Sequence, residues 1–262
     1  DYETLSKNNP KLIYCSVTGF GQDGPRAHKA GYDFMIQGMS GIMDITGEPG
    51  GMPQKVGVAF ADIFTGLYGV IGIQAALVQR TRTGKGQHID MALFDCMLAA
   101  QANQNLNYLI SGVSPQRMGN AHPSIVPYQV FPVSDGHIVI ACGNNRQFHN
   151  LATALGREEW IKNPIFYDNI TRIANRIEVA SAITAELNNW EKLKILPVLE
   201  AAGVPSGPIN TIAEALEDPQ TLHRKMRISP EGIPGIRTPI KFSDSELQLV
   251  RAAPGLGEHN NN

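Results

Sequence analysis

The chain has 262 residues, of which 42% are hydrophobic and 18% charged, and its formal net charge is −2. This composition is typical of a globular protein with room for one large domain or two modest ones, and it excludes disordered and fibrous classes. The near-neutral balance, without a long Lys/Arg run, gives no indication of nucleic acid or an anionic membrane as a partner.

Three widely spaced cysteines, Cys15, Cys96 and Cys142, form no CxxC pair and no Cys/His spacing typical of a metal site. We therefore expect reduced thiols, no bound metal and a cytoplasmic protein. We recognise no signal peptide and no uninterrupted apolar stretch long enough to span a bilayer, so no membrane partner is expected. The chain begins at "DYETL" without Met, and we expect it to be a piece of something longer.

The first part of the chain alternates strand and helix patterns. "KLIYCSV" (11–17) has the β-branched and aromatic content of a buried strand, and "HIDMAL" (88–93) alternates like a second strand. Helix patterns occupy residues 31–46, 62–80 and 94–110, and the apolar residues all around 62–80 predict full burial of that helix. Strands that alternate with helices favour a parallel α/β sheet.

The pattern changes after Gly112. A polar, proline-containing loop leads to "YQVFPVSDGHIVIACG" (128–143), which predicts a hairpin around Ser134-Asp135-Gly136. Further helices are expected at residues 146–155, 175–188, 190–202 and 211–217, followed by an extended, turn-rich tail. We predict an α/β part before about residue 112 and a smaller α+β part from about 125 to 225, joined by a linker over 113–124.

One acidic residue, Asp62, interrupts the apolar, glycine-rich stretch "GVAFADIFTGLYG" (57–69) at the start of the long predicted helix. Two interpretations remain open. Asp62 serves as an N-cap or first-turn carboxylate, which helix starts favour, and it can at the same time serve as a nucleophile that the helix dipole keeps ionised.

Two glycine-containing loops are further candidates. "GFGQDG" (19–24) matches GxGxxG spacing, but Pro25 and the missing acidic partner argue against a dinucleotide site; a loop beside a ligand at a strand's carboxyl end is favoured. Residues Gly119, Asn120, Ala121 and His122 form either a plain interdomain linker or a loop that covers an active site. The other six histidines share no spacing that indicates metal ligation.

Taken in order, six segments resemble the class III coenzyme A transferases, the family that includes formyl-CoA transferase, carnitine CoA-transferase and α-methylacyl-CoA racemase. They are "NPKLIYCSVTGFGQDGP" (9–25), "AGYDFMIQGMSGIMDITG" (30–47), "VGVAFADIFTGLYG" (56–69), "RTGKGQHIDMALFD" (82–95), "GNAHPSIVPYQVF" (119–131) and "AAPGLGEHN" (252–260).

The resemblance implies a role for each candidate residue. Asp62 matches the family's catalytic carboxylate, which forms covalent aspartyl intermediates without a metal or redox cofactor. Ala30, Gly31, Tyr32 and Asp33 match the segment that contacts the CoA thioester, and 119–122 occupies the place of the loop that shields the intermediate.

The resemblance also separates two activities within the family. The racemase branch carries a His where this chain has Tyr32, and a phenol, with a reference pKa near ~10, is a poor base at neutral pH. The implied function is therefore transfer of CoA from an acyl-CoA to a free acid. Residues 119–131 and 141–148 look most like the branch that uses dicarboxylic acids. A CoA-thioester racemase and an inactive fragment remain the alternatives.

The family's architecture completes the expectation. It implies a Rossmann-like large domain, incomplete at its N-terminus, formed by 1–112 with 226–262, and a small α+β domain over 125–225. It also implies an interlocked homodimer.

Overall fold

The computed structural model describes residues 1–260, so the last two residues of the predicted 226–262 tail lie outside the described residues. Contacts divide the chain into two units, Asp1–Ile125 and the part from Val126 onward. The boundary falls directly after the expected linker. The association of 226–262 with the first domain stays a prediction.

The first unit contains a parallel strand pair, as the alternating pattern predicts. Strands β1 and β2 are in register from Tyr14 opposite His88 to Thr18 opposite Ala92. The mixed α/β class is confirmed, whereas the Rossmann-like arrangement stays a prediction. The elements of this unit are α1 (Tyr2–Asn8), β1 (Tyr14–Thr18), α2 (Asp33–Ser40), α3 (Ile42–Ile45), α4 (Phe60–Thr83), β2 (His88–Ala92), α5 (Leu93–Ala100) and α6 (Asn103–Ser111).

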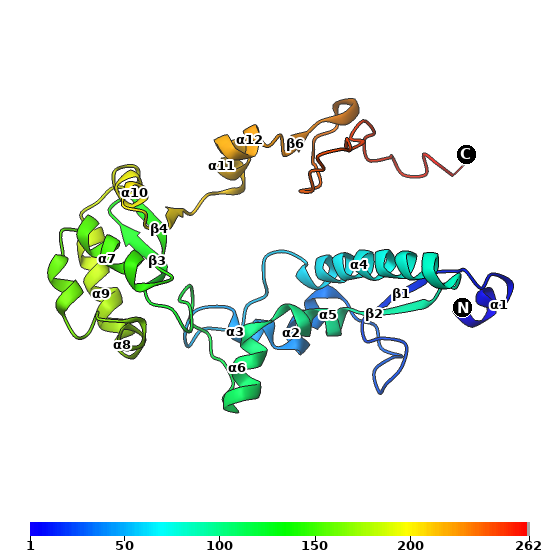
Figure 1. Ribbon diagram of the computed structural model, residues 1–262, viewed down its shortest axis with the longest axis horizontal. Helices are drawn as coiled ribbons and strands as arrows, with labels where there is room; N and C mark the ends of the chain where they lie inside the picture. The colour runs from blue at the N-terminus through cyan, green and yellow to red at the C-terminus, as the bar shows by residue number, and fades with distance from the viewer. Residues whose placement is uncertain (261–262) are drawn as a thin grey trace. The chain divides into compact units, whose positions relative to one another are not determined.

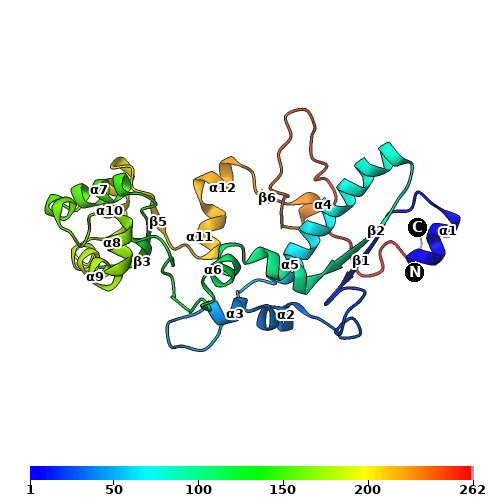
Figure 2. The same ribbon diagram turned by 60° about the horizontal axis from the view of Figure 1, so that its bottom comes forward.

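The long helix α4 packs one side on α5 and on the strand pair (Figures 1 and 2). Small residues let neighbouring elements approach this side of the helix. Gly72 faces Ile89 of β2, and a Cβ added to Gly72 would lie 3.2 Å from the Ile89 side chain. The buried positions are Ala61, Thr65, Gly69 and Ala76.

The expectation of full burial for this helix is wrong. Five large apolar side chains, Ile63, Leu67, Val70, Ile71 and Val78, are exposed along the other side of α4. Helices α2 and α5 and the two strands leave the rest of α4 uncovered, so apolar composition all around does not by itself produce burial. Among residues 1–260, α4 is the one helix long and apolar enough to cross a membrane, a property it shares with core helices of soluble proteins.

The predicted helix over 94–110 is interrupted. Ala102 has φ +42°, outside the helical range, and separates α5 from α6. The buried Gln101 just before it donates Nε2–H to the Ser40 carbonyl at 2.8 Å and to the Met97 carbonyl at 3.3 Å. Tertiary bonding at this point overrides a helical pattern that looks continuous in sequence.

The second unit begins with the predicted hairpin, β3 (Tyr128–Val133) and β4 (Gly136–Ala141), to which β5 (Ser206–Pro208) adds a third antiparallel strand. Helices α7–α10 pack around it (Figure 1). The other elements are α7 (Asn145–Ala154), η1 (Glu158–Lys162), α8 (Asn169–Ala174), α9 (Arg176–Leu187), α10 (Lys192–Ala201), α11 (Ile212–Glu217), α12 (Pro219–His223), β6 (Arg227–Ile228), η2 (Pro230–Gly232) and β7 (Gly235–Ile236).

A fully buried arginine lies in the core of this unit. Arg172 donates to the carbonyls of Val126 at 2.7 Å and Phe166 at 2.9 Å and to Asn145 Oδ1 at 2.8 Å. Its guanidinium carbon lies 4.5 Å from the centroid of the Phe148 ring. These contacts offset part of the cost of burying the charge.

Candidate functional site

Asp62 is the third residue of α4, and its side chain is exposed. Among residues 1–260 its carboxylate makes no hydrogen bond or ion pair. The N-cap interpretation is therefore wrong, because Ala59 is the N-cap, whereas the placement in the first turn is confirmed. The carboxylate lies in the first turn of a 24-residue helix, the end of the helix at which the dipole attracts negative charge.

The cap that Asp62 does not provide comes from another helix. Asp33, the first residue of α2, accepts the Ala61 N–H on Oδ1 at 2.9 Å. That N–H belongs to the first turn of α4 and would otherwise lack a partner within the helix. A carboxylate distant in sequence thereby caps the helix one residue before Asp62.

A buried amide connects Asp33 to the loop that leads into α4. Gln37, 0% exposed, donates Nε2–H to Asp33 Oδ2 at 2.8 Å and to the Val58 carbonyl at 3.3 Å. Its Oε1 accepts the Val56 N–H at 2.9 Å. The amide thus uses both donor hydrogens and its acceptor, and the two loop residues that it holds lie shortly before Asp62 in the chain.

The AGYD segment lies against the glycine loop 18–25. A Cβ on Gly19 would come within 2.5 Å of the Gly31 Cα, so neither residue tolerates a side chain there. The neighbouring Tyr32 is the N-cap of α2 and is 74% exposed. Ala30 is also exposed, so residues 30–32 are accessible to solvent. Asp33 caps the start of α4.

The glycine loop itself is held by the second strand. Asp90 of β2 accepts the Gln22 N–H on Oδ2 at 2.8 Å, and Thr18 Oγ1 accepts the Gly21 N–H at 2.9 Å. The loop therefore stands at the carboxyl ends of β1 and β2, the edge at which open parallel sheets bind ligands.

The loop 119–122 is anchored to a different part of the first unit. Gly119, at φ +58°, donates its N–H to the Gly47 carbonyl at 3.0 Å. His122 Nδ1 accepts the Ser124 N–H at 3.0 Å. The structure thus brings the Asp33 carboxylate to Ala61, the residue before Asp62, whereas Gly119 is bound to Gly47.

Gln37 is the residue of this site that the sequence patterns do not single out. The available signal is its position four residues after Asp33 within a predicted helix, because side chains at i and i+4 meet on one helix face. Its bonds to Val56 and Val58 become visible only in the folded chain.

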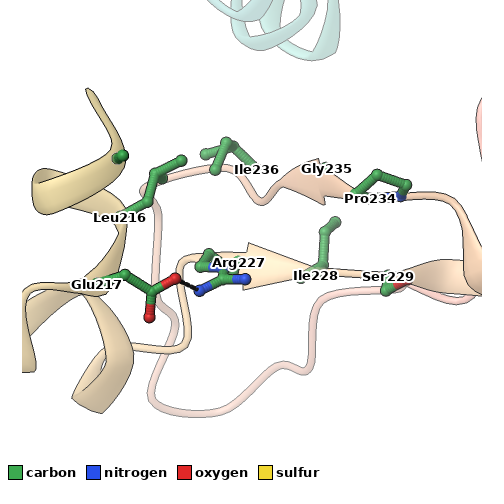
Figure 3. A pocket seen from close by; sticks show the side chains of 9 residues that line it. Leu216, Glu217, Arg227, Ile228, Ser229, Pro234, Gly235 and Ile236 are labelled. Atoms are coloured by element: carbon green, nitrogen blue, oxygen red, sulfur yellow. Dashed lines mark hydrogen bonds and ion pairs between the residues drawn. The ribbon is translucent and has the colours of Figure 1, made fainter. Parts of the chain in front are cut away.

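The second unit carries a buried thiol and a hollow of its own. Burial raises the pKa of the Cys142 thiol to about 12, so that thiol is a poor nucleophile at neutral pH. A hollow of about 730 Å³ lies between α11 and the β6–β7 hairpin of the second unit, where Arg227 pairs with Glu217 (Figure 3). No group of three or more His, Cys, Asp or Glu side chains able to hold a metal occurs among residues 1–260.

Comparison with known proteins identifies the family. The model of CoA-transferase family III matches residues 1–260. The chain is 52% identical over 264 residues to the succinate–glutarate CoA-transferase of Agrobacterium fabrum, covering 99% of this chain and 66% of the relative. It is 41% identical over 260 residues to the acetyl-CoA:oxalate CoA-transferase of Acetobacter aceti, covering 98% and 67%.

A solved structure is similar as well. The crystal structure of a CAIB/BAIF family protein from Brucella suis superposes with a TM-score of 0.86 at 59% identity, covering 99% of this chain and 69% of that one. The chain belongs to CoA-transferase family III. It spans about two thirds of the length of these relatives.

Proposed function

We propose that the protein transfers coenzyme A from an acyl-CoA thioester to a free dicarboxylic acid, with Asp62 as the covalent nucleophile. The observation that carries this proposal is the position of Asp62 in a chain of this family. Asp62 is an exposed carboxylate in the first turn of α4, without a hydrogen-bond or ion-pair partner among residues 1–260. The N-terminal end of a helix attracts negative charge, and a carboxylate is a competent nucleophile toward a thioester.

Each chemical step exchanges one leaving group for another. An Asp62 oxygen attacks the thioester carbonyl, the C–S bond breaks, and CoA leaves as thiolate, which yields a mixed anhydride. The thiolate then attacks the aspartyl carbonyl of the anhydride and releases the donor acid, leaving an aspartyl-CoA thioester. The acceptor carboxylate attacks that thioester and expels thiolate, which finally attacks the acceptor's acyl carbonyl and frees Asp62. No metal or redox cofactor takes part.

The other predicted residues receive roles in the same proposal. Tyr32, exposed at the start of α2, contacts the substrate together with Ala30 and Gly31, and the Gly19–Gly31 contact keeps backbone rather than side chains at that surface. The loop of Gly119, Asn120, Ala121 and His122 shields the aspartyl intermediate from water. Dicarboxylic acids are favoured because relatives are named for succinate, glutarate and oxalate.

The chemical test of the nucleophile uses the protein as expressed from its native gene, with succinyl-CoA and no acceptor acid. Hydroxylamine or borohydride is then expected to modify the peptide that contains Asp62, because only an activated carboxyl reacts readily with either reagent. Mass spectrometry locates the modified residue. Labelling of another acidic residue, with the Asp62 peptide unmodified, contradicts the proposal.

The racemase alternative makes an opposite prediction about proton exchange. When a 2-methylacyl-CoA is offered in heavy water, we expect no deuterium at the α-carbon, because a phenol stands at position 32 in place of the histidine base of the racemase branch. Mass spectrometry of the recovered thioester measures the uptake. Rapid incorporation at that carbon would restore the racemase.

Assembly and location belong to the same proposal. We infer that the protein acts in the cytoplasm as an interlocked homodimer. The exposed apolar side of α4, from Ile63 to Val78, supports burial against protein that these residues do not themselves provide.

A further inference from the structure

We infer that Gln37 and Asp33 act as a positioning pair that sets the place of the Asp62 backbone, and that Asp33 serves this role rather than binding the CoA moiety. The inference rests on the proposed function of Asp62. It concerns a residue, Gln37, to which the family resemblance assigns nothing.

The pair joins α2 to the segment that leads into α4, two parts of the first unit that are not paired as strands of one sheet. Residues 51–59, which lead into α4, form no helix or strand. Near the helix, their carbonyls accept the Phe60 N–H at Val58, 2.9 Å, and the Ile63 N–H at Ala59, 3.1 Å, and Gln54 donates its N–H to the Thr46 carbonyl at 3.0 Å. Gln37 adds bonds to Val56 and Val58 from outside the loop, and Asp33 adds one to Ala61.

The pair is a closed network in which every polar group has a partner. Both Asp33 oxygens accept one bond each, from Ala61 N–H and from Gln37 Nε2. Gln37 is fully buried, and its amide makes three bonds. Buried networks of this kind specify one geometry, since a change in any member leaves polar groups without partners.

The consequence for catalysis follows from position alone. Ala61 immediately precedes Asp62, and Thr65 holds the same turn from the other side by donating its hydroxyl to the Ala61 carbonyl at 2.7 Å. A nucleophile misplaced by about 1 Å loses rate on the order of a hundredfold, although substrate still binds. Disturbing the pair is therefore expected to lower kcat while KM remains nearly constant.

The first experiment replaces the buried amide with a side chain of similar length. Gln37→Met is expected to reduce kcat by about ten- to a hundredfold, with succinyl-CoA and glutarate as the probe substrates and KM for both within about threefold of wild type. The matched control is Gln101→Met, which removes another buried amide of the same unit that bonds Ser40 and Met97 instead. The control is expected to lower the melting temperature to a similar degree while kcat is retained.

A second experiment exchanges the carboxylate and the amide between positions 33 and 37. It distinguishes a loss of positioning from a general loss of stability. Asp33→Asn places two amides face to face, and Gln37→Glu places two carboxylates face to face, so each single change disturbs the 2.8 Å bond. In the double variant the amide at position 33 donates to the carboxylate at position 37, and that carboxylate still accepts the Val56 N–H, whereas the Val58 carbonyl loses its donor and recovery is therefore partial. We expect the double variant to recover kcat by about tenfold over the weaker single variant, which is a coupling that independent residues do not show.

Each outcome decides the inference. Loss of kcat in Gln37→Met, with Gln101→Met active and the double variant recovered, supports it. Wild-type kcat in Gln37→Met, equal kcat loss in Gln101→Met, or a double variant no better than either single variant overturns it while the proposed function stands. A wild-type protein that exchanges no CoA, or whose Asp62 is not labelled by hydroxylamine, overturns the proposed function and this inference with it.

Discussion

Replacement of Asp62 by Asn is expected to abolish CoA transfer and to leave the fold nearly unchanged. Asn preserves the shape of the side chain, and the carboxylate it replaces is exposed and without a partner among residues 1–260. The free energy of unfolding should therefore change by about 1 kcal/mol or less. Turnover should fall at least about a thousandfold, because a neutral amide cannot form the anhydride.

Transfer from succinyl-CoA to glutarate measures the kinetic effect, and thermal unfolding measures the structural one. The matched control is Asp95→Asn, which neutralises another exposed first-turn carboxylate, on α5 of the same unit. That variant should retain activity, which separates a specific role for Asp62 from the general loss of an acidic group. Substantial transfer by Asp62→Asn would refute the assignment.

Replacement of Arg172 by Met is expected to produce the largest loss of stability in the second unit. The change leaves the buried backbone carbonyls of Val126 and Phe166 without their donor, and it removes the donor to the oxygen of Asn145, an exposed residue. Each buried unsatisfied group costs about 1–3 kcal/mol, and relief from burying the guanidinium offsets part of this. We expect a net loss of about 3 kcal/mol in the free energy of unfolding, within the range for breaking a buried polar network.

Urea unfolding followed by tryptophan fluorescence measures this loss, because both tryptophans of the chain, Trp160 and Trp190, lie in the second unit. Trp160 is buried and stacks on Phe166 at 5.1 Å between ring centroids, so its emission reports directly on the core around Arg172. Arg146→Met, at an exposed position of α7, is the control and should change stability by no more than about 0.5 kcal/mol. A loss below about 1 kcal/mol for Arg172→Met would contradict the prediction.

Sequence patterns predict several helices and strands of this chain, because the residues that cause these elements to form are close together in the sequence. The alternation of the hairpin segment and Gly136 at its turn lead to β3 and β4 close to the expected bounds. The apolar run after residue 60 leads to α4, and the first-turn position of Asp62 follows from it. The six ordered segments that resemble class III CoA-transferases predict the family, which the match over residues 1–260 confirms.

Three features depend on contacts between distant residues. The break at Ala102 follows from the Gln101 bond to Ser40, 61 residues away. The exposed side of α4 reflects which elements pack on it, a property that composition does not contain. The cap of α4 comes from Asp33, 28 residues before Ala61, and Gln37 secures it by bonds to the loop that precedes the helix.

The sequence by itself therefore determined the family, the candidate nucleophile and most elements, because periodicity, turn residues and motif order are properties of short stretches. Only the tertiary structure decided what holds Asp62 in place. Hydrogen bonds of a buried network join residues that are distant in the chain, so the cap of α4 at Ala61 comes from Asp33, a residue that the family resemblance places at the CoA thioester.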